Sequence, residues 1–150
     1  MERLPYATSF RDLFAYQLAK GLSKDIFEVS KQFPKEEMYS LTDQIRRSSR
    51  AVGAQIAEAW AKRRYERSFV SKLTDADGEQ QETQHWLETA FDCGYLDEAD
   101  LADLLARCQR VGKLLGGMIE KSDLFCGAIK PVLREATAEY VVFEDVEDLT

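Results

Sequence analysis

The only histidine of the chain, His85, follows Glu82 at the Glu-x-x-His spacing. On a helix this spacing places a carboxylate and an imidazole on neighbouring turns, and carboxylate di-iron bundles use it to hold their metal. Such a centre also needs a second Glu-x-x-His motif and a glutamate from each of two further helices. A chain with one histidine cannot supply the second motif. We therefore interpret His85 as a surface residue and expect no metal and no cofactor.

Cysteine is the other residue type with reactive potential, and the chain contains Cys93, Cys108 and Cys126. A catalytic thiol needs a neighbouring base, and His85 is the only imidazole that could serve. The cysteines are odd in number and form no CxxC pair, which favours reduced residues of a cytoplasmic protein over disulfides or metal ligands. The chain also has no glycine-rich phosphate-binding loop. These features predict a protein that is not an enzyme.

The net charge of the chain is −7, but charges of the two signs are segregated along the sequence. Within residues 46–72 only Glu58 and Glu66 oppose a run of basic residues, whereas residues 73–106 contain no Lys or Arg. A protein of negative net charge can still present one basic surface. The net charge therefore argues against general polyanion binding without excluding a local site.

The basic segment contains the candidate nucleic-acid contacts. These candidates are Arg46, Arg47, Arg50, Lys62, Arg63, Arg64 and Arg67. Those within residues 62–67 surround Tyr65 at an expected turn, where cations can meet phosphates and the ring can stack on a base. Two other interpretations stay open, namely a solvated turn and ion pairs with the acidic residues of another subunit. RNA or DNA is thus one candidate partner.

Apolar residues recur at the three- and four-residue spacing of amphipathic helices. This spacing predicts helices at about 9–33, 41–62, 66–93 and 97–124, joined by short turns. Such helices pack as an antiparallel up-down-up-down bundle, so we expect an all-α four-helix bundle over residues 1–125. Residues 126–150 are expected to form an irregular acidic tail. No apolar run approaches the roughly 18 residues of a membrane span, and no export signal is visible, which indicates a cytoplasmic protein without membrane contact.

The helix starts and the first core stripe can also be predicted. Ser9 is the expected N-cap of the first helix, and Ser40 and Asp43 have the spacing of a capping box before the second. Four-residue spacing places the first core stripe on Phe10, Phe14, Leu18, Leu22 and Ile26. In the third helix Gln80 and Thr83 interrupt the apolar stripe, so they are either hydrogen-bonded inside the bundle or less deeply buried.

The second helix has two contrasting faces. Its core stripe is Leu41, Ile45, Val52, Ile56 and Ala59, and the opposite face is arginine and small residues. Because glycine inside a helix costs about 1 kcal/mol relative to alanine, an exposed Gly53 suggests close approach of another helix. We therefore predict an oligomer interface, with the alternative of a plain solvated face. Its candidate residues are Tyr16 and Phe27 on the first helix and Gly53, Ala54, Ala57 and Ala61 on the second.

The run FPKEEMYSLTDQIRRSSRAVGAQIAEAW, residues 33–60, resembles the four-helix-bundle family named after intervening sequences in 23S ribosomal RNA genes. The positions that match the family pattern are Phe33, Pro34, Glu37, Leu41, Thr42, Gln44, Ile45, Arg46, Arg47, Ile56, Ala57 and Glu58. The opening SFRDLFAYQLAKGL is similar to the first helix of the family. One departure is Ala59, which stands where the family usually has glycine and blurs the turn after the second helix.

This resemblance implies a bundle that assembles into a ring, pentameric where members have been seen, and it implies no settled activity. A related group serves as accessory proteins of diversity-generating retroelements, where a basic ring surface is thought to hold nucleic acid. For this chain the resemblance therefore implies a homo-oligomer as the first partner and a nucleic acid as the alternative.

Overall fold

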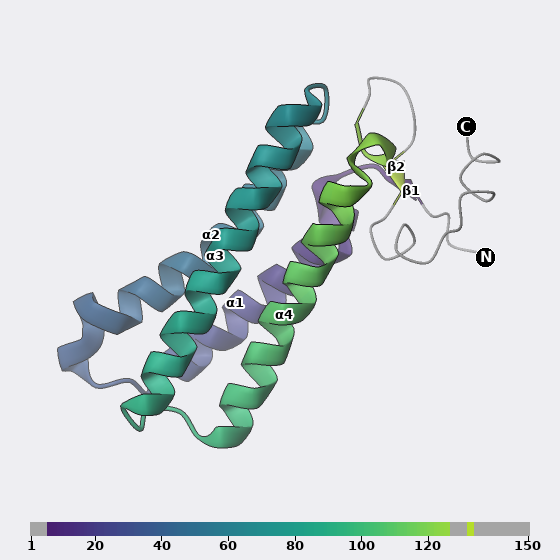
Figure 1. Cartoon of the computed structure of the whole chain (residues 1–150). Helices are drawn as coiled ribbons and strands as arrows, with labels where there is room; N and C mark the ends of the chain where they lie inside the picture. Colours follow the sequence, from purple (N-terminus) through teal and green to yellow (C-terminus); the bar gives the residue numbers. More distant parts are fainter. Residues whose placement is uncertain (1–5, 127–131, 134–150) are drawn as a thin grey trace.

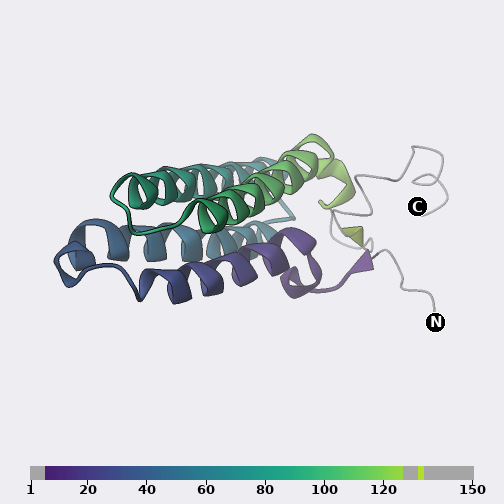
Figure 2. The same cartoon turned by 90° about the horizontal axis from the view of Figure 1, so that it is seen from below.

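The computed structural model describes residues 6–126 and 132–133. Its main elements are the helices α1 (Phe14–Ser30), α2 (Asp43–Ala61), α3 (Glu66–Asp92) and α4 (Glu98–Glu120). They run alternately up and down as an all-α four-helix bundle (Figure 1). Seen from below, α1 and α2 form one layer and α3 and α4 the other (Figure 2). Within the described part of the chain, no helix is both long enough and apolar enough to span a membrane.

The chain enters α1 through a 3₁₀ turn, η1 (Phe10–Asp12). Ser9 caps this turn, since its side chain accepts a hydrogen bond from the Arg11 backbone N–H. Leu13 then has an extended backbone, and α1 begins only after it. Ser9 is therefore an N-cap as expected, but of the 3₁₀ turn rather than of α1.

The prediction that Leu18 belongs to the core stripe is wrong, because its side chain is 42% exposed. Steps of four residues advance 400° around a helix of 100° per residue, so a strict four-residue series drifts away from the core. The buried face of α1 follows mixed steps of three and four, and its members are Ala15, Ala19, Leu22, Ile26 and Ser30.

The start of α2 also differs from the prediction. A 3₁₀ turn, η2 (Lys35–Glu37), leads into a π-helical turn, η3 (Met38–Thr42), which continues into α2. The residue before α2, Thr42, already has helical backbone angles and makes no side-chain capping bond. The expected capping box of Ser40 and Asp43 is therefore absent, because the chain is helical before it reaches Asp43.

The turn that joins α2 to α3 lies at residues 62–65. At the other end of α3, Gly94 has a φ of +80°, the left-handed conformation that favours glycine after a helix C-terminus. Asp97 then caps α4, since its side chain accepts a hydrogen bond from the Asp100 backbone N–H. At each of these turns the chain reverses its direction, so consecutive helices are antiparallel.

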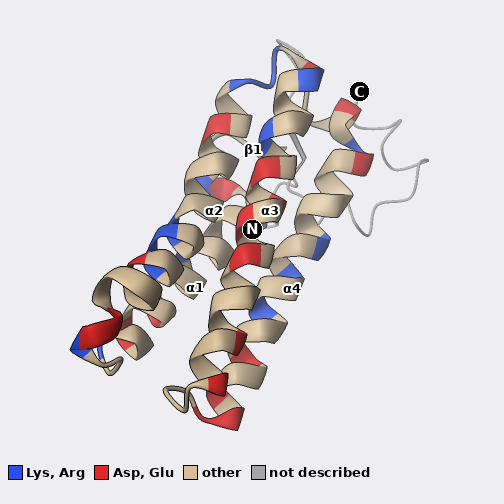
Figure 3. Ribbon diagram, turned by 60° about the vertical axis from the view of Figure 1, so that its left-hand side comes forward, with Lys and Arg blue, Asp and Glu red and all other residues tan. Residues whose placement is uncertain are grey.

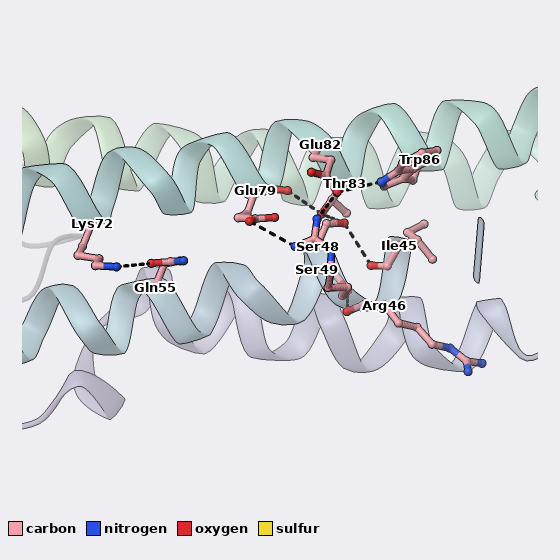
Figure 4. Close-up of polar contacts among 11 residues, drawn as sticks. Ile45, Arg46, Ser48, Ser49, Gln55, Lys72, Glu79, Glu82, Thr83 and Trp86 are labelled. Carbon is pink, nitrogen blue, oxygen red and sulfur yellow. Dashed lines mark hydrogen bonds and ion pairs between the residues drawn. The ribbon is translucent and has the colours of Figure 1, made fainter. Parts of the chain in front are cut away.

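Two of the buried residues on the core stripe of α3 are polar. Thr83 is fully buried, and its hydroxyl lies 2.9 Å from that of Ser48 (Figure 4). Gln80 is 4% exposed, and its amide bonds to Asp77 and Gln84. The interruption of the apolar stripe of α3 is therefore hydrogen-bonded inside the bundle.

After α4 a 3₁₀ turn, η4 (Ser122–Leu124), brings Phe125 onto the core ring of Phe69, with ring centroids 6.0 Å apart. Two short strands, β1 (Tyr6–Ala7) and β2 (Val132–Leu133), pair antiparallel. Most of the predicted acidic tail, residues 127–131 and 134–150, lies outside the described residues.

Candidate functional site

A groove of about 300 Å³ runs along the surface between α1 and α2. We call it the α1–α2 groove. Its lining residues are Phe10, Tyr16, Ala19, Lys20, Ser23, Arg50, Gly53, Ala54 and Ala57. Tyr16, Gly53, Ala54 and Ala57 from the predicted oligomer interface thus lie together here, whereas Phe27 and Ala61 do not line it.

The floor of the groove is made of small residues of both helices, and part of it is already covered by α1. Gly53 is buried, and a Cβ atom added to it would lie 3.8 Å from Cε1 of Tyr16. Tyr16 in turn makes an edge contact with Phe10, with ring centroids 4.8 Å apart. The expectation of an exposed Gly53 is therefore wrong, since its small size accommodates Tyr16 of the same chain. Ala54 remains exposed beside it.

Cations gather over the aromatic rings of this face. The guanidinium carbons of Arg46 and Arg50 lie 4.7 and 5.2 Å from the ring centroid of Phe27. Lys20 Nζ lies 5.9 Å from the ring of Tyr16. A cation over an aromatic face is held by the ring quadrupole without losing its charge. The groove thus has a small, apolar floor and a rim of positive charge.

These rim cations have no carboxylate partner within the described part of the chain. Arg46 donates from Nε to the hydroxyl of Ser30 at 2.7 Å, which orients the guanidinium without neutralising it. Lys20 and Arg50 form no ion pair with any described residue. This end of the α1–α2 face is therefore positively charged although the whole chain is acidic.

Arg47 lies apart from this rim, because its side chain crosses to α3. Its guanidinium pairs with Glu82 at 2.5 Å and with Glu79 at 3.5 Å. The hydrogen bond to Glu82 raises the pKa of Arg47. Figure 4 shows Glu79 and Glu82 on α3 facing α2, with the indole N–H of Trp86 also donating to Glu82 at 3.0 Å. Arg47 thus joins two helices and is already occupied.

The third group of cations lies at the turn between α2 and α3. Lys62, Arg64 and Arg67 are exposed there and form no ion pair with a described residue. Arg63 differs, since it stacks 3.5 Å above the ring of Trp60 and donates to the Trp60 carbonyl at 2.9 Å. Partial burial lowers the pKa of Arg63. The structure therefore divides the predicted nucleic-acid contacts among three places.

The residues first weighed for catalysis lie in different environments. His85 is exposed on α3 and contacts the ring of Trp86 edge-on. Cys108 is buried in the core, and burial raises the pKa of its thiol to about 12. Among residues 6–126 and 132–133, no group of three or more His, Cys, Asp or Glu residues has an arrangement that could hold a metal ion.

Comparison with known protein families shows to which of them the chain is related. A family model described as 23S rRNA-intervening sequence protein matches residues 11–117, well over half of the chain. The chain belongs to this family. The match spans α1, α2, α3 and most of α4, so all three cation groups and, apart from Phe10, the α1–α2 groove lie within the matched range.

A solved structure is also similar to this 23S rRNA-intervening sequence family member. It is a protein of unknown function from the S23 ribosomal protein family of Bacteroides thetaiotaomicron, with 25% sequence identity and a TM-score of 0.66. The alignment covers 73% of this chain and 98% of that one. A comparison with curated proteins finds no match. Neither similarity assigns an activity, so function must be argued from the surfaces.

One surface feature was missed by the sequence reasoning. A polar cleft of about 520 Å³ lies between α3 and α4, and its residues are Asp77, Gln80, Gln81, Gln84, His85, Glu88, Gln109 and Gly112. A Cβ atom on Gly112 would lie 2.6 Å from Nε2 of Gln80. The sequence signal for this cleft was Gln80, a polar residue on the apolar stripe of α3, together with Gly112, a glycine inside α4.

Proposed function

We propose that this family member is a non-enzymatic scaffold that self-associates, with the α1–α2 groove as its contact with a second copy. The observation that carries the proposal is the combination of an exposed Ala54 and a half-buried Ala57 on a groove floor that another backbone can approach closely. The family resemblance supports a ring, with a pentamer as the expected size. A cytoplasmic location belongs to the same proposal.

A second copy suits the groove because its charge is complementary. Lys20 and Arg50, which line the groove, and Arg46 one turn before Arg50 lack carboxylate partners among the described residues. Every other copy of the chain carries a net charge of −7 and a segment, residues 73–106, that has acidic residues but no Lys or Arg. Opposite charges across an interface favour encounter and fix its orientation.

The test is light scattering over a micromolar concentration series. Ala54→Trp fills the groove with a large side chain at an exposed position, so it should leave the monomer folded and prevent association. The matched control is Ala102→Trp on α4, where another exposed alanine lies outside the groove. Wild-type protein that stays monomeric throughout the series would end the proposal.

A second candidate is a nucleic-acid adaptor, the alternative that the resemblance to retroelement accessory proteins implies. Its supporting observation is the turn between α2 and α3, where Lys62, Arg64 and Arg67 are exposed and Tyr65 is 66% exposed. Cations beside an exposed ring are the combination that binds phosphate and stacks a base. In an oligomer the turn would repeat, so modest contacts would add.

Binding of labelled RNA and DNA at several salt concentrations tests this candidate. Each phosphate contact should steepen the salt dependence by about 0.9 units on double-stranded DNA. Arg64→Ala combined with Arg67→Ala should weaken binding, whereas Arg110→Ala combined with Lys113→Ala on α4 should not. No binding of either nucleic acid at about 50 mM salt would exclude the adaptor.

A further inference from the structure

The part of the chain that follows the short strand pair has a sequence complementary to the α1–α2 groove. Residues 134–150 lie outside the described residues, and their sequence contains an apolar stretch followed directly by an acidic one. Residues 140–143 are Tyr-Val-Val-Phe, and residues 144–148 are Glu-Asp-Val-Glu-Asp. We call residues 140–148 the tail segment.

The groove offers an apolar floor and a cationic rim in the same order along its length. Because α1 and α2 are antiparallel and η1 contacts α2, Phe10 and Ala57 lie at one end of the groove. Ser23 and Arg50 lie at the other end. Arg46 lies one further turn along α2 in the same direction. A chain that enters beside Phe10 therefore meets small and aromatic residues first and cations afterwards.

The groove cations remain free to meet an acidic segment, because neighbouring carboxylates are bound elsewhere. Asp25 of α1 pairs with Arg107 of α4 at 2.7 Å, and Glu58 of α2 pairs with Lys72 of α3 at 2.9 Å. Figure 3 shows basic residues both along α2 and at the turn that follows it. The groove combines its cations with an apolar floor, whereas the turn presents its cations beside the exposed ring of Tyr65.

The strand pair holds the start of the tail close to the entrance of the groove. Leu133 pairs with Tyr6, and paired strand residues have Cα atoms about 5 Å apart. Phe10 follows Tyr6 by four residues, which span at most about 14 Å. The groove thus begins within about 20 Å of Leu133. The seven residues from Leu133 to Tyr140 can span about 23 Å, so the tail segment can reach the groove without any change in the bundle.

We infer that the tail segment docks in the α1–α2 groove of its own chain. Its apolar half, residues 140–143, lies on the small residues of the floor, and its acidic half meets Lys20, Arg50 and Arg46. Burial of the apolar side chains favours this contact, and opposite charges fix its direction. The short tether keeps the segment at an effective concentration in the millimolar range.

This inference also rests on the proposed self-association in one respect, because the groove cannot hold the tail segment and a second copy at the same time. The tail segment is then a competitor that sets the concentration at which copies associate. With an effective concentration of about 1 mM and a dissociation constant of about 0.5 mM for the free segment, docking raises the midpoint concentration of assembly about threefold.

Disulfide trapping tests the contact in the full chain. In a Cys93→Ser background, which removes the exposed native thiol, Ala54→Cys is combined with Val142→Cys. Oxidised glutathione should link this pair within one chain about tenfold faster than the control pair of Ala102→Cys with Val142→Cys. Ala102 is an exposed alanine on α4, outside the groove. Mass spectrometry of mixed isotope-labelled and unlabelled chains separates links within a chain from links between chains.

Two pairs of isosteric substitutions test the charge. Glu144→Gln with Asp145→Asn removes two charges from the tail segment and should slow the link to Ala54→Cys about threefold. Glu135→Gln with Glu139→Gln removes two charges from the tether and should leave the rate unchanged. Without the cysteine substitutions, the first pair should lower the midpoint concentration of assembly about threefold at about 0.1 M NaCl, and the second should not change it.

Three trapping results would overturn the inference. These are a link to Ala54→Cys no faster than the link to Ala102→Cys, a link that forms only between chains, and a faster link to Arg64→Cys at the turn. An unchanged midpoint in the variant of Glu144→Gln with Asp145→Asn would overturn the competition for the groove. A chain that never assembles, although the link to Ala54→Cys forms rapidly within it, would contradict the proposed function alone.

Discussion

At the scale of single residues, the glycines inside the helices have different surroundings. Gly53 lies under Tyr16, and Gly112 lies under the amide of Gln80, whereas Gly78 and Gly116 face open space. A substitution with alanine improves helix propensity at each position, but it meets a neighbour only at the first two. The effect of the same chemical change therefore depends on what lies above each glycine.

Gly112→Ala should be less stable than Gly116→Ala by about 1–3 kcal/mol. The new methyl group at position 112 would lie 2.6 Å from Nε2 of Gln80, which is buried and held by two hydrogen bonds, so the amide must move. Gly116→Ala should gain up to about 1 kcal/mol instead. Urea denaturation measures both, and equal stability of the two variants would show that Gln80 yields without cost.

The three thiols should differ in reactivity within the folded protein. Cys93 is exposed, whereas Cys108 is fully buried and its pKa is raised to about 12, so it stays protonated at neutral pH. Partial burial also raises the pKa of Cys126 to about 11. A thiol reagent at about pH 8 should therefore modify Cys93 first, because the thiolate is the nucleophile. Rapid modification of Cys108 without denaturant would contradict the buried position.

At the scale of elements, the stability of the bundle should follow its observed faces. Leu115 on α4 is fully buried, and Leu18 on α1 is 42% exposed. Leu115→Ala should cost about 2–5 kcal/mol, since it leaves a cavity. Leu18→Ala should cost about 0.5 kcal/mol or less, as surface substitutions do. Thermal or urea unfolding gives both values, and a loss at Leu18 as large as at Leu115 would contradict the assigned face.

The fold was predictable from spacing because each helix has one apolar face that needs a partner. The core stripe of α2 is buried as expected, with Ile45 and Ile56 at 0% exposure. The error at Leu18 arose because a strict four-residue series does not stay on one face of a helix, so Leu18 falls outside the buried face that Leu22 and Ile26 share. The π-helical turn before α2 was equally invisible, since its residues have ordinary helix-forming types. A local break of this kind changes which residues of the following helix face the core, and it leaves no mark on the amino-acid composition.

The candidate surfaces were predictable only in part. Small residues at positions 53, 54 and 57 indicated a contact face, but which chain would cover Gly53 depends on Tyr16, more than thirty residues earlier. The arginines were treated as one group, yet Arg47 turns toward Glu82 while Arg46 turns toward Phe27. Neighbouring positions on a helix point 100° apart, so a run of like charges in sequence need not form one surface.

At the scale of the whole molecule, the segregation of charge should control association. The cations of the groove and the net acidic charge of residues 73–106 belong to different parts of the chain, so in the proposed oligomer their attraction would act between copies. Raising NaCl from about 0.1 to 1 M shortens the screening length from about 10 to 3 Å, which should raise the midpoint concentration of assembly. Sedimentation at the two salt concentrations measures this shift. A lower midpoint concentration of assembly at the higher NaCl concentration would indicate an apolar contact instead.

The short strand pair has a consequence for how the connectivity of the chain can be changed. Because Tyr6 pairs with Leu133 and Ala7 with Val132, segments from the two ends of the sequence are held side by side. Segments that are close in space can be joined by a linker, and new ends can be opened at a surface turn. A circular permutant opened at Gly94 would thus present fusion partners from the opposite end of the bundle while keeping every helix whole.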